Sequence, residues 1–145
     1  MRSLILALSI VTPLILFIPI QSDLASSRLM LETPTYDGSG QAVHPDVFHS
    51  SWGWPKAAKY RYWMVLTPYA YSDFSRENPS ILVSNNGRNW FVPEGLVNPI
   101  EPAPTEGHYS DPDIVMGDGR LWVFFRWDKG LEERIYAKSS NDGIH

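Results

Sequence analysis

Large apolar side chains recur in short runs along this chain, and the segments between the runs are rich in glycine, proline and asparagine. In the run 60–67 both alternate sets of positions are apolar, which is typical of a strand packed on both faces. The same pattern, bounded by turn residues, predicts strands at 42–48, 60–67, 79–84, 90–92, 113–116, 121–126 and 134–139. We therefore expect an all-β protein.

These strands fall into two units that nearly repeat one another. The segment His44-Pro45-Asp46-Val47-Phe48 is echoed by Asp111-Pro112-Asp113-Ile114-Val115, at an offset of 111 − 44 = 67 residues. The turn at 84–87 is echoed at 140–143, an offset of 140 − 84 = 56 residues. A repeated unit of several strands indicates a propeller or an array of sheets. We expect one four-stranded blade at 42–105 and an incomplete blade at 106–145, which together are too few to close a ring of about 4 to 8 blades.

The amino-terminal segment has a different character from the rest. Between residues 4 and 20 only Ser9 and Thr12 are polar, and Arg2 supplies a positive charge ahead of the run. This pattern predicts an apolar helix within residues 1–25 that is either a cleaved signal peptide or a retained membrane anchor, and a polar linker follows at 26–41. We expect a secreted or extracytoplasmic protein, with membrane contact only through residues 4–20 if that segment is not cleaved.

The charge and the residue content limit the kinds of partner and cofactor that we expect. The chain has 145 residues, 12 Lys and Arg against 16 Asp and Glu, and no cysteine. Because the basic residues are scattered among the acids, we expect no nucleic-acid partner. The four histidines show no metal-ligand spacing, so we predict no metal site and no cofactor; a central calcium ion is conceivable but has no support in the sequence.

The two repeated turns resemble the Asp-box hairpin of sialidases and related propellers. The matching residues are Ser84-x-Asn86-Gly87-x-x-Trp90 and Ser140-x-Asp142-Gly143, with one residue fewer between the acid position and the aromatic residue. Such a hairpin is structural: the Asn or Asp side chain caps the turn amides, the glycine adopts a positive φ, and the tryptophan packs between blades. The resemblance implies an architecture and not a chemistry.

The segment 110–115, followed by 117–122, resembles the five-bladed glycoside hydrolases of the arabinanase and xylosidase type. The resemblance implies a ring of five blades, of which about two are present here, with carboxylates at strand starts in a central funnel. In that family an Asp before proline is the general base, and this chain has His44 there. Asp46, on the same strand face by the two-residue period, is the nearest substitute. The family's general acid lies in a later blade, so we expect this fragment to be inactive alone.

Four acids are candidates for catalysis. Glycosidic cleavage uses two carboxyl groups roughly 5 to 9.5 Å apart, and strand starts around a propeller axis could hold Asp46, Asp111 and Asp113 at such distances. Glu77 is the fourth candidate. The alternative for the Asp-Pro positions is that each aspartate only fixes a turn by accepting hydrogen bonds from nearby amides.

Two cationic or polar side chains are candidates for substrate binding. His44 could hold a substrate hydroxyl or be a satisfied structural histidine. Arg126 ends an apolar strand and could contact a carboxylated sugar. A salt bridge from Arg126 to Asp111 or Asp113 is the competing interpretation.

Aromatic residues in loops are the remaining candidates for substrate binding. Trp52, Trp54, Tyr69 and Tyr71 lie in the two loops of the first unit. Flat rings stack on sugar faces through apolar area and ring polarisation, although loops also bury aromatic rings for packing alone.

The sequence leads to two hypotheses of function. The first is an exported glycoside hydrolase acting on a poly- or oligosaccharide. The alternative is a non-catalytic glycan-binding or adhesin module that uses the aromatic loops and leaves the acids structural.

Overall fold

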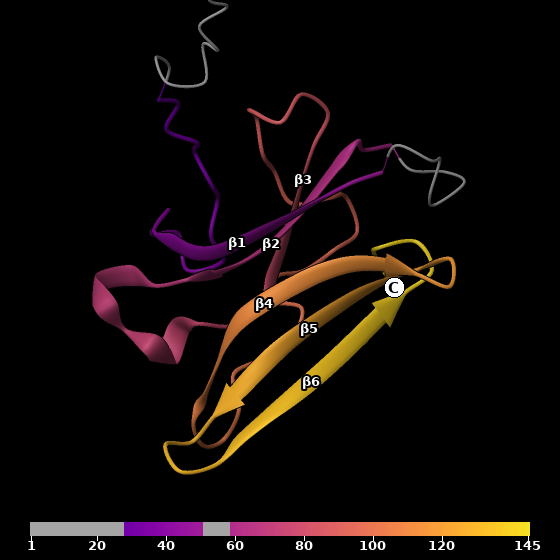
Figure 1. The fold of residues 1–145 in the computed structure, drawn as a ribbon. Helices are drawn as coiled ribbons and strands as arrows, with labels where there is room; N and C mark the ends of the chain where they lie inside the picture. The colour runs from indigo at the N-terminus through magenta and orange to yellow at the C-terminus, as the bar shows by residue number, and fades with distance from the viewer. Residues whose placement is uncertain (1–27, 51–58) are drawn as a thin grey trace, which may run out of the picture.

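The computed structural model describes residues 28–50 and 59–145, which form two antiparallel sheets of three strands each (Figure 1). The first sheet consists of β1 (Ala42–His49), β2 (Tyr62–Pro68) and β3 (Ser80–Ser84), and the second of β4 (His108–Gly117), β5 (Arg120–Asp128) and β6 (Glu133–Ser140). Two short 3-10 segments, η2 (Ala70–Ser72) and η3 (Phe74–Arg76), connect β2 to β3. No helix in the described ranges is long and apolar enough to span a membrane. The predicted apolar helix of residues 4–20 lies outside those ranges.

The all-β prediction is confirmed, and six of the predicted strands form at or near their expected positions. The strand predicted at 90–92 is wrong, because Phe91 makes only an isolated bridge to Val83. Pro93 follows two residues later and has no N–H to donate, so the ladder cannot continue there. The first unit is therefore a three-stranded sheet rather than a four-stranded blade, and the described residues form no closed ring.

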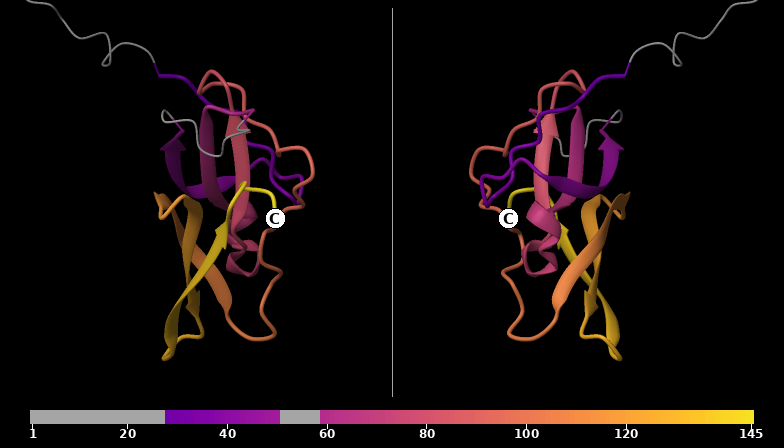
Figure 2. Two further views of the ribbon diagram at one scale, coloured as in Figure 1. Left: turned by 90° about the vertical axis from the view of Figure 1, so that its right-hand side faces the viewer. Right: turned by 90° about the vertical axis from the view of Figure 1, so that its left-hand side faces the viewer.

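The main core lies between the two sheets. In the side views of Figure 2 the second sheet lies below the first, and β4 contacts both β1 and β2. The core residues alternate along β2, β3 and β5, as side chains on one face of a sheet must, whereas in β4 they lie on either side of a register shift. They are Trp63, Val65, Ile81 and Val83 from the first sheet and Tyr109, Ile114, Leu121, Val123 and Phe125 from the second.

A second, smaller core covers the other face of the first sheet. Met64, Leu66 and Leu82 alternate with the residues of the main core and pack with Trp90. The indole of Trp90 covers the face of the first sheet that is turned away from the second, so its packing between blades stays a prediction.

The two repeated turns have the predicted internal hydrogen bonds. In each turn the serine hydroxyl, of Ser84 or Ser140, accepts the N–H groups two and three residues ahead at 2.8 to 3.2 Å. The side-chain oxygen of Asn86 or Asp142 then accepts the next two N–H groups, all four at 2.9 Å. The capping prediction is confirmed, and it explains why the same short motif appears at the end of β3 and of β6.

Gly143 provides a test of how this turn is joined to the core. Gly143 has φ +80°, and a Cβ added there would lie 2.4 Å from the ring of Trp63. We expect Gly143→Ala to lower the free energy of unfolding by about 2–4 kcal/mol, through left-handed strain and overpacking. Gly119→Ala is the matched control, because Gly119 has φ +71° and a Cβ there meets no atom within 4 Å. Urea unfolding of both variants would measure the difference, and equal losses would contradict the clash with Trp63.

Candidate functional site

Two β-bulges occupy equivalent positions of the repeat. The register of β1 against β2 shifts between Val43 and Asp46, and that of β4 against β5 shifts between Ser110 and Asp113. Each bulge contains a non-glycine residue with positive φ, His44 at 51° and Asp111 at 49°. Bulges re-aim side chains, and backbone strain of this kind is concentrated at functional sites.

The two strained residues face each other across the sheets. His44 Nε2 lies 3.4 Å from Asp111 Oδ1, and both side chains are about half exposed. The other carboxylate oxygen of Asp111 lies 3.1 Å from Arg126 Nε. The sequence interpretation that Arg126 pairs with Asp111 is thus confirmed, and Asp111 links an imidazole of one sheet to a guanidinium of the other.

Arg126 is held in place by four acceptors. Besides Asp111, its Nε donates to Ser110 Oγ at 3.1 Å, and its terminal nitrogens lie 3.6 Å from Asp128 and 3.7 Å from Glu133. Because Ser110 is buried and Asp128 and Glu133 extend from β5 and β6, the guanidinium is fixed against the second sheet. It orients Asp111 and supplies positive charge next to it.

Glu77 completes the cluster from the connection between η3 and β3. Only 6% of the residue is exposed, and its backbone N–H donates to the carbonyl of Phe74 at 3.0 Å. Burial raises the pKa of Glu77, while the nearby charges of His44, His108 and Arg126 act to lower it and that of Asp111 acts to raise it. A buried carboxyl group with a raised pKa is suited to exchanging a proton near neutral pH.

Asp46 and Asp113 form a separate carboxyl pair between the sheets. Asp46 accepts N–H groups from Val47 at 2.9 Å and from Ile114 at 2.8 Å, which are equivalent residues of the two units. Burial raises the pKa of Asp46, but hydrogen bonds from Asp113, Ile114 and Val47 outweigh it and lower the pKa. The hydrogen bond to Asp46, then burial, raises the pKa of Asp113. The hydrogen bond between the two carboxyl groups therefore joins β1 to β4.

The bulge explains why His44 and Asp46 have different partners. The two-residue period of a strand places them on one face, and Asp46 was expected to replace His44 as the base on that ground. The register shift between Val43 and Asp46 breaks the alternation. His44 contacts the carboxylate of Asp111, whereas the carboxylate of Asp46 accepts the backbone N–H groups of Val47 and Ile114.

The structure describes only some of the aromatic residues that were predicted to contact a sugar. Trp52 and Trp54 lie outside the described residues. Tyr69 is half-buried, and its N–H donates to the carbonyl of Gln41 at 2.9 Å as the chain enters η2. Sequence reasoning missed His108 and Phe74, whose rings are in contact with centroids 4.9 Å apart. A lone histidine and one phenylalanine in a polar loop offered no spacing that would have identified them.

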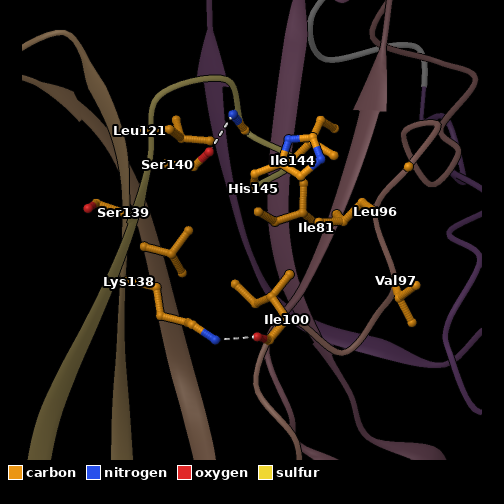
Figure 3. A pocket seen from close by; sticks show the side chains of 13 residues that line it. Ile81, Leu96, Val97, Ile100, Leu121, Lys138, Ser139, Ser140, Ile144 and His145 are labelled. Atoms are coloured by element: carbon orange, nitrogen blue, oxygen red, sulfur yellow. Dashed lines mark hydrogen bonds between the residues drawn. The ribbon is translucent and has the colours of Figure 1, made fainter.

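A cavity of about 360 Å³ opens elsewhere between the sheets. Figure 3 shows Lys138, Ser139 and Ser140 of β6 on one side of it and Ile81, Leu96 and Ile100 on the other, with Ile144 and His145 next to Ile81. Lys138 spans it and donates to the carbonyl of Ile100 at 2.7 Å. None of the predicted site residues within the described ranges lines this cavity, so their candidate chemistry is concentrated at the bulges instead.

The chain is similar to two known proteins, both N-acetylgalactosamine deacetylases. No family model matches the chain. It is 37% identical over 113 residues to the A type blood N-acetyl-alpha-D-galactosamine deacetylase of Flavonifractor plautii, covering 72% of this chain but 14% of that protein. It also resembles the crystal structure of an N-acetylgalactosamine deacetylase from F. plautii in complex with blood group B trisaccharide, with TM-score 0.70 and 35% identity. That match covers 79% of this chain and 32% of the crystallised one.

These similarities overturn the resemblance drawn from the Asp-Pro strand starts. The similar proteins are N-acetylgalactosamine deacetylases, which cleave an amide, and not five-bladed glycosidases or sialidases. The glycoside hydrolase hypothesis and its kinship with arabinanases, xylosidases and sialidases are therefore wrong, and the similarities give no better support to the adhesin alternative. The Asp-Pro motif misled because it marks a strand start with a bulge, a feature of backbone geometry that different reactions can use.

The opposite pKa shifts of Asp46 and Asp113 predict a distinctive pH dependence of stability. A raised pKa at Asp113 stabilises the fold at low pH, and this contribution is lost as the pH rises through the folded value. We expect Asp113→Asn to raise the free energy of unfolding at pH 7 by up to about 1 kcal/mol, because its amide can donate to Asp46 without charge repulsion. Near pH 4 the gain should shrink, which urea unfolding at several pH values would measure.

Asp46→Asn is the matched comparison for this pair. The carboxylate accepts one N–H on each oxygen, and an amide offers a single oxygen, so one acceptor is lost. We expect a loss of roughly 1.5 kcal/mol at pH 7. If Asp46→Asn and Asp113→Asn had the same free energy of unfolding, Asp46 would not be the main hydrogen-bond acceptor of the pair.

Proposed function

We propose that this chain contributes catalytic residues to a carbohydrate N-deacetylase that removes the acetyl group from an N-acetylated amino sugar. The similarity to N-acetylgalactosamine deacetylases supports the reaction class. The observation that carries the proposal is the buried Glu77 beside the His44 and Asp111 pair. The chain spans 14% of the curated relative, so the activity of the whole protein is part of the proposal.

Removal of an N-acetyl group is the hydrolysis of an amide. Water adds to the acetyl carbonyl while a base takes one of its protons, which gives a tetrahedral oxyanion. An acid then protonates the sugar nitrogen, the C–N bond breaks, and the products are acetate and a free amino sugar. The reaction needs one base, one acid and positive charge near the oxyanion.

The cluster offers a group for each of these tasks. Glu77 would act as the base, since burial brings its pKa closer to neutral pH. His44, whose imidazole Asp111 orients from 3.4 Å, would protonate the leaving nitrogen. Arg126 would keep Asp111 in position and add positive charge. Asp46 and Asp113, predicted as catalytic, would instead hold the two sheets together.

Several expectations from the sequence belong to this proposal. We infer that the two sheets are neighbouring units of a larger repeated all-β protein, and their arrangement as propeller blades stays a prediction. Export through residues 4–20 also stays a prediction, as does the absence of a cofactor. Within the described ranges no three His, Asp or Glu side chains are grouped so that they could hold a metal ion. A saccharide is the expected partner, because the similar crystal structure is a complex with a trisaccharide.

The role of Glu77 can be tested by substitution. We expect Glu77→Gln to lower kcat for acetate release from an N-acetylgalactosaminide by roughly 100-fold or more, since removal of a general base costs about that factor. The assay should use the protein with any sequence that its gene encodes on either side. Glu94→Gln is the control, because Glu94 is exposed and pairs only at the surface with Lys59, at 2.9 Å. Unchanged turnover in Glu77→Gln would remove Glu77 from the mechanism.

The pH profile tests the same role independently. The base must be ionised, so kcat/KM should fall as the pH drops through the pKa of Glu77, which burial places above the ordinary value of a glutamate. A profile that stays flat down to the ordinary glutamate range would contradict a buried base.

A further inference from the structure

We infer that Phe74, held against His108, is a stacking platform for the sugar ring of the substrate. This inference rests on the proposed function and adds a binding subsite to it. Phe74 lies in η3, three residues before Glu77, and Figure 1 shows η2 and η3 beside the beginnings of β1 and β4, which carry the two bulges. The platform is therefore on the rim of the candidate site.

Phe74 lies in an exposed segment that leads directly into a buried one. The residue is 57% exposed, although Glu77, Asn78 and Pro79 immediately after η3 are buried. Its ring meets the imidazole of His108 with centroids 4.9 Å apart and planes tilted by 49°. One face or edge of the ring is thus supported by β4 while much of the remainder is open to solvent.

The segment that carries Phe74 is rigidly anchored. Asp73 accepts the N–H of Ser75 at 3.1 Å and the Nε of Arg76 at 3.1 Å. Arg76 also reaches the buried carboxylate of Asp37 at 3.3 Å, and its carbonyl accepts the hydroxyl of Tyr36 at 2.8 Å. A segment whose backbone is held in this way loses little conformational entropy when a ligand binds.

The chemistry of the platform fits a sugar with an apolar face. A pyranose ring of galacto configuration presents several C–H groups on one side, and these pack on the face of an aromatic ring. Phe74 has no polar atom to contribute, so it would select for shape and leave the acetamido group to His44 and Glu77. His108, which contacts Phe74, is also close enough to Glu77 to influence the pKa of that carboxyl group, so the platform lies near the proposed base.

The test separates binding from hydrolysis. We expect Phe74→Ala to raise KM for an N-acetylgalactosaminide, and to weaken binding of methyl N-acetylgalactosaminide measured by NMR titration, by roughly 5- to 10-fold, with kcat little changed. Phe74→Trp should restore binding. Phe91→Ala is the control, since Phe91 is 42% exposed at the bridge to Val83. Thermal melting should show that Phe74→Ala is folded.

The outcomes distinguish this inference from the proposed function. If Phe74→Ala binds the methyl glycoside as tightly as the unmodified protein, or if Phe91→Ala weakens binding equally, the platform is refuted. If the protein binds the sugar through Phe74 but Glu77→Gln leaves hydrolysis unchanged, or no hydrolysis occurs at all, the platform stands and the assigned catalytic role fails.

Discussion

The contact between the equivalent bulges of β1 and β4 is the constraint on which the site depends. Asp46 accepts one N–H from its own strand and one from Ile114, the counterpart of Val47 in the other sheet. The carboxylate of Asp46 therefore connects two strands that are equivalent in the repeat. Because it holds the bulges together, His44 of one sheet lies against Asp111 of the other. Without that contact the candidate acid and its orienting carboxylate would belong to separate surfaces.

The carboxyl groups of this region have separate tasks because their surroundings differ. Asp111 is half exposed and lies between His44 and Arg126, so its charge is compensated. Glu77 is buried, and desolvation is the largest influence on its pKa. Asp46 and Asp113 are hydrogen-bonded to each other, which lowers the pKa of Asp46 and raises that of Asp113. Pairs of acids whose environments drive their pKa values apart are the usual basis for distinct roles in catalysis.

Motif reasoning named several residues of the cluster at the bulges, together with a reaction that the similarities contradict. His44, Glu77, Asp111 and Arg126 were all candidates, since an acid or histidine at a strand start or end is a local signal. The reaction had no local signal, because Asp-Pro strand starts and capped turns describe backbone geometry that unrelated hydrolases can share. The proposed reaction rests instead on the similarity to deacetylases.

Local patterns in the chain were sufficient for the strands, the repeat and the capped turns, because hydrophobic period and turn chemistry act over a few residues. They could not show that a bulge would break the alternation between His44 and Asp46, or that Pro93 would stop a fourth strand after one bridge. They also could not pair Asp46 with Asp113 or place His108 beneath Phe74. Those contacts join residues that are distant in the chain, and only the packing of one sheet against the other brings them together.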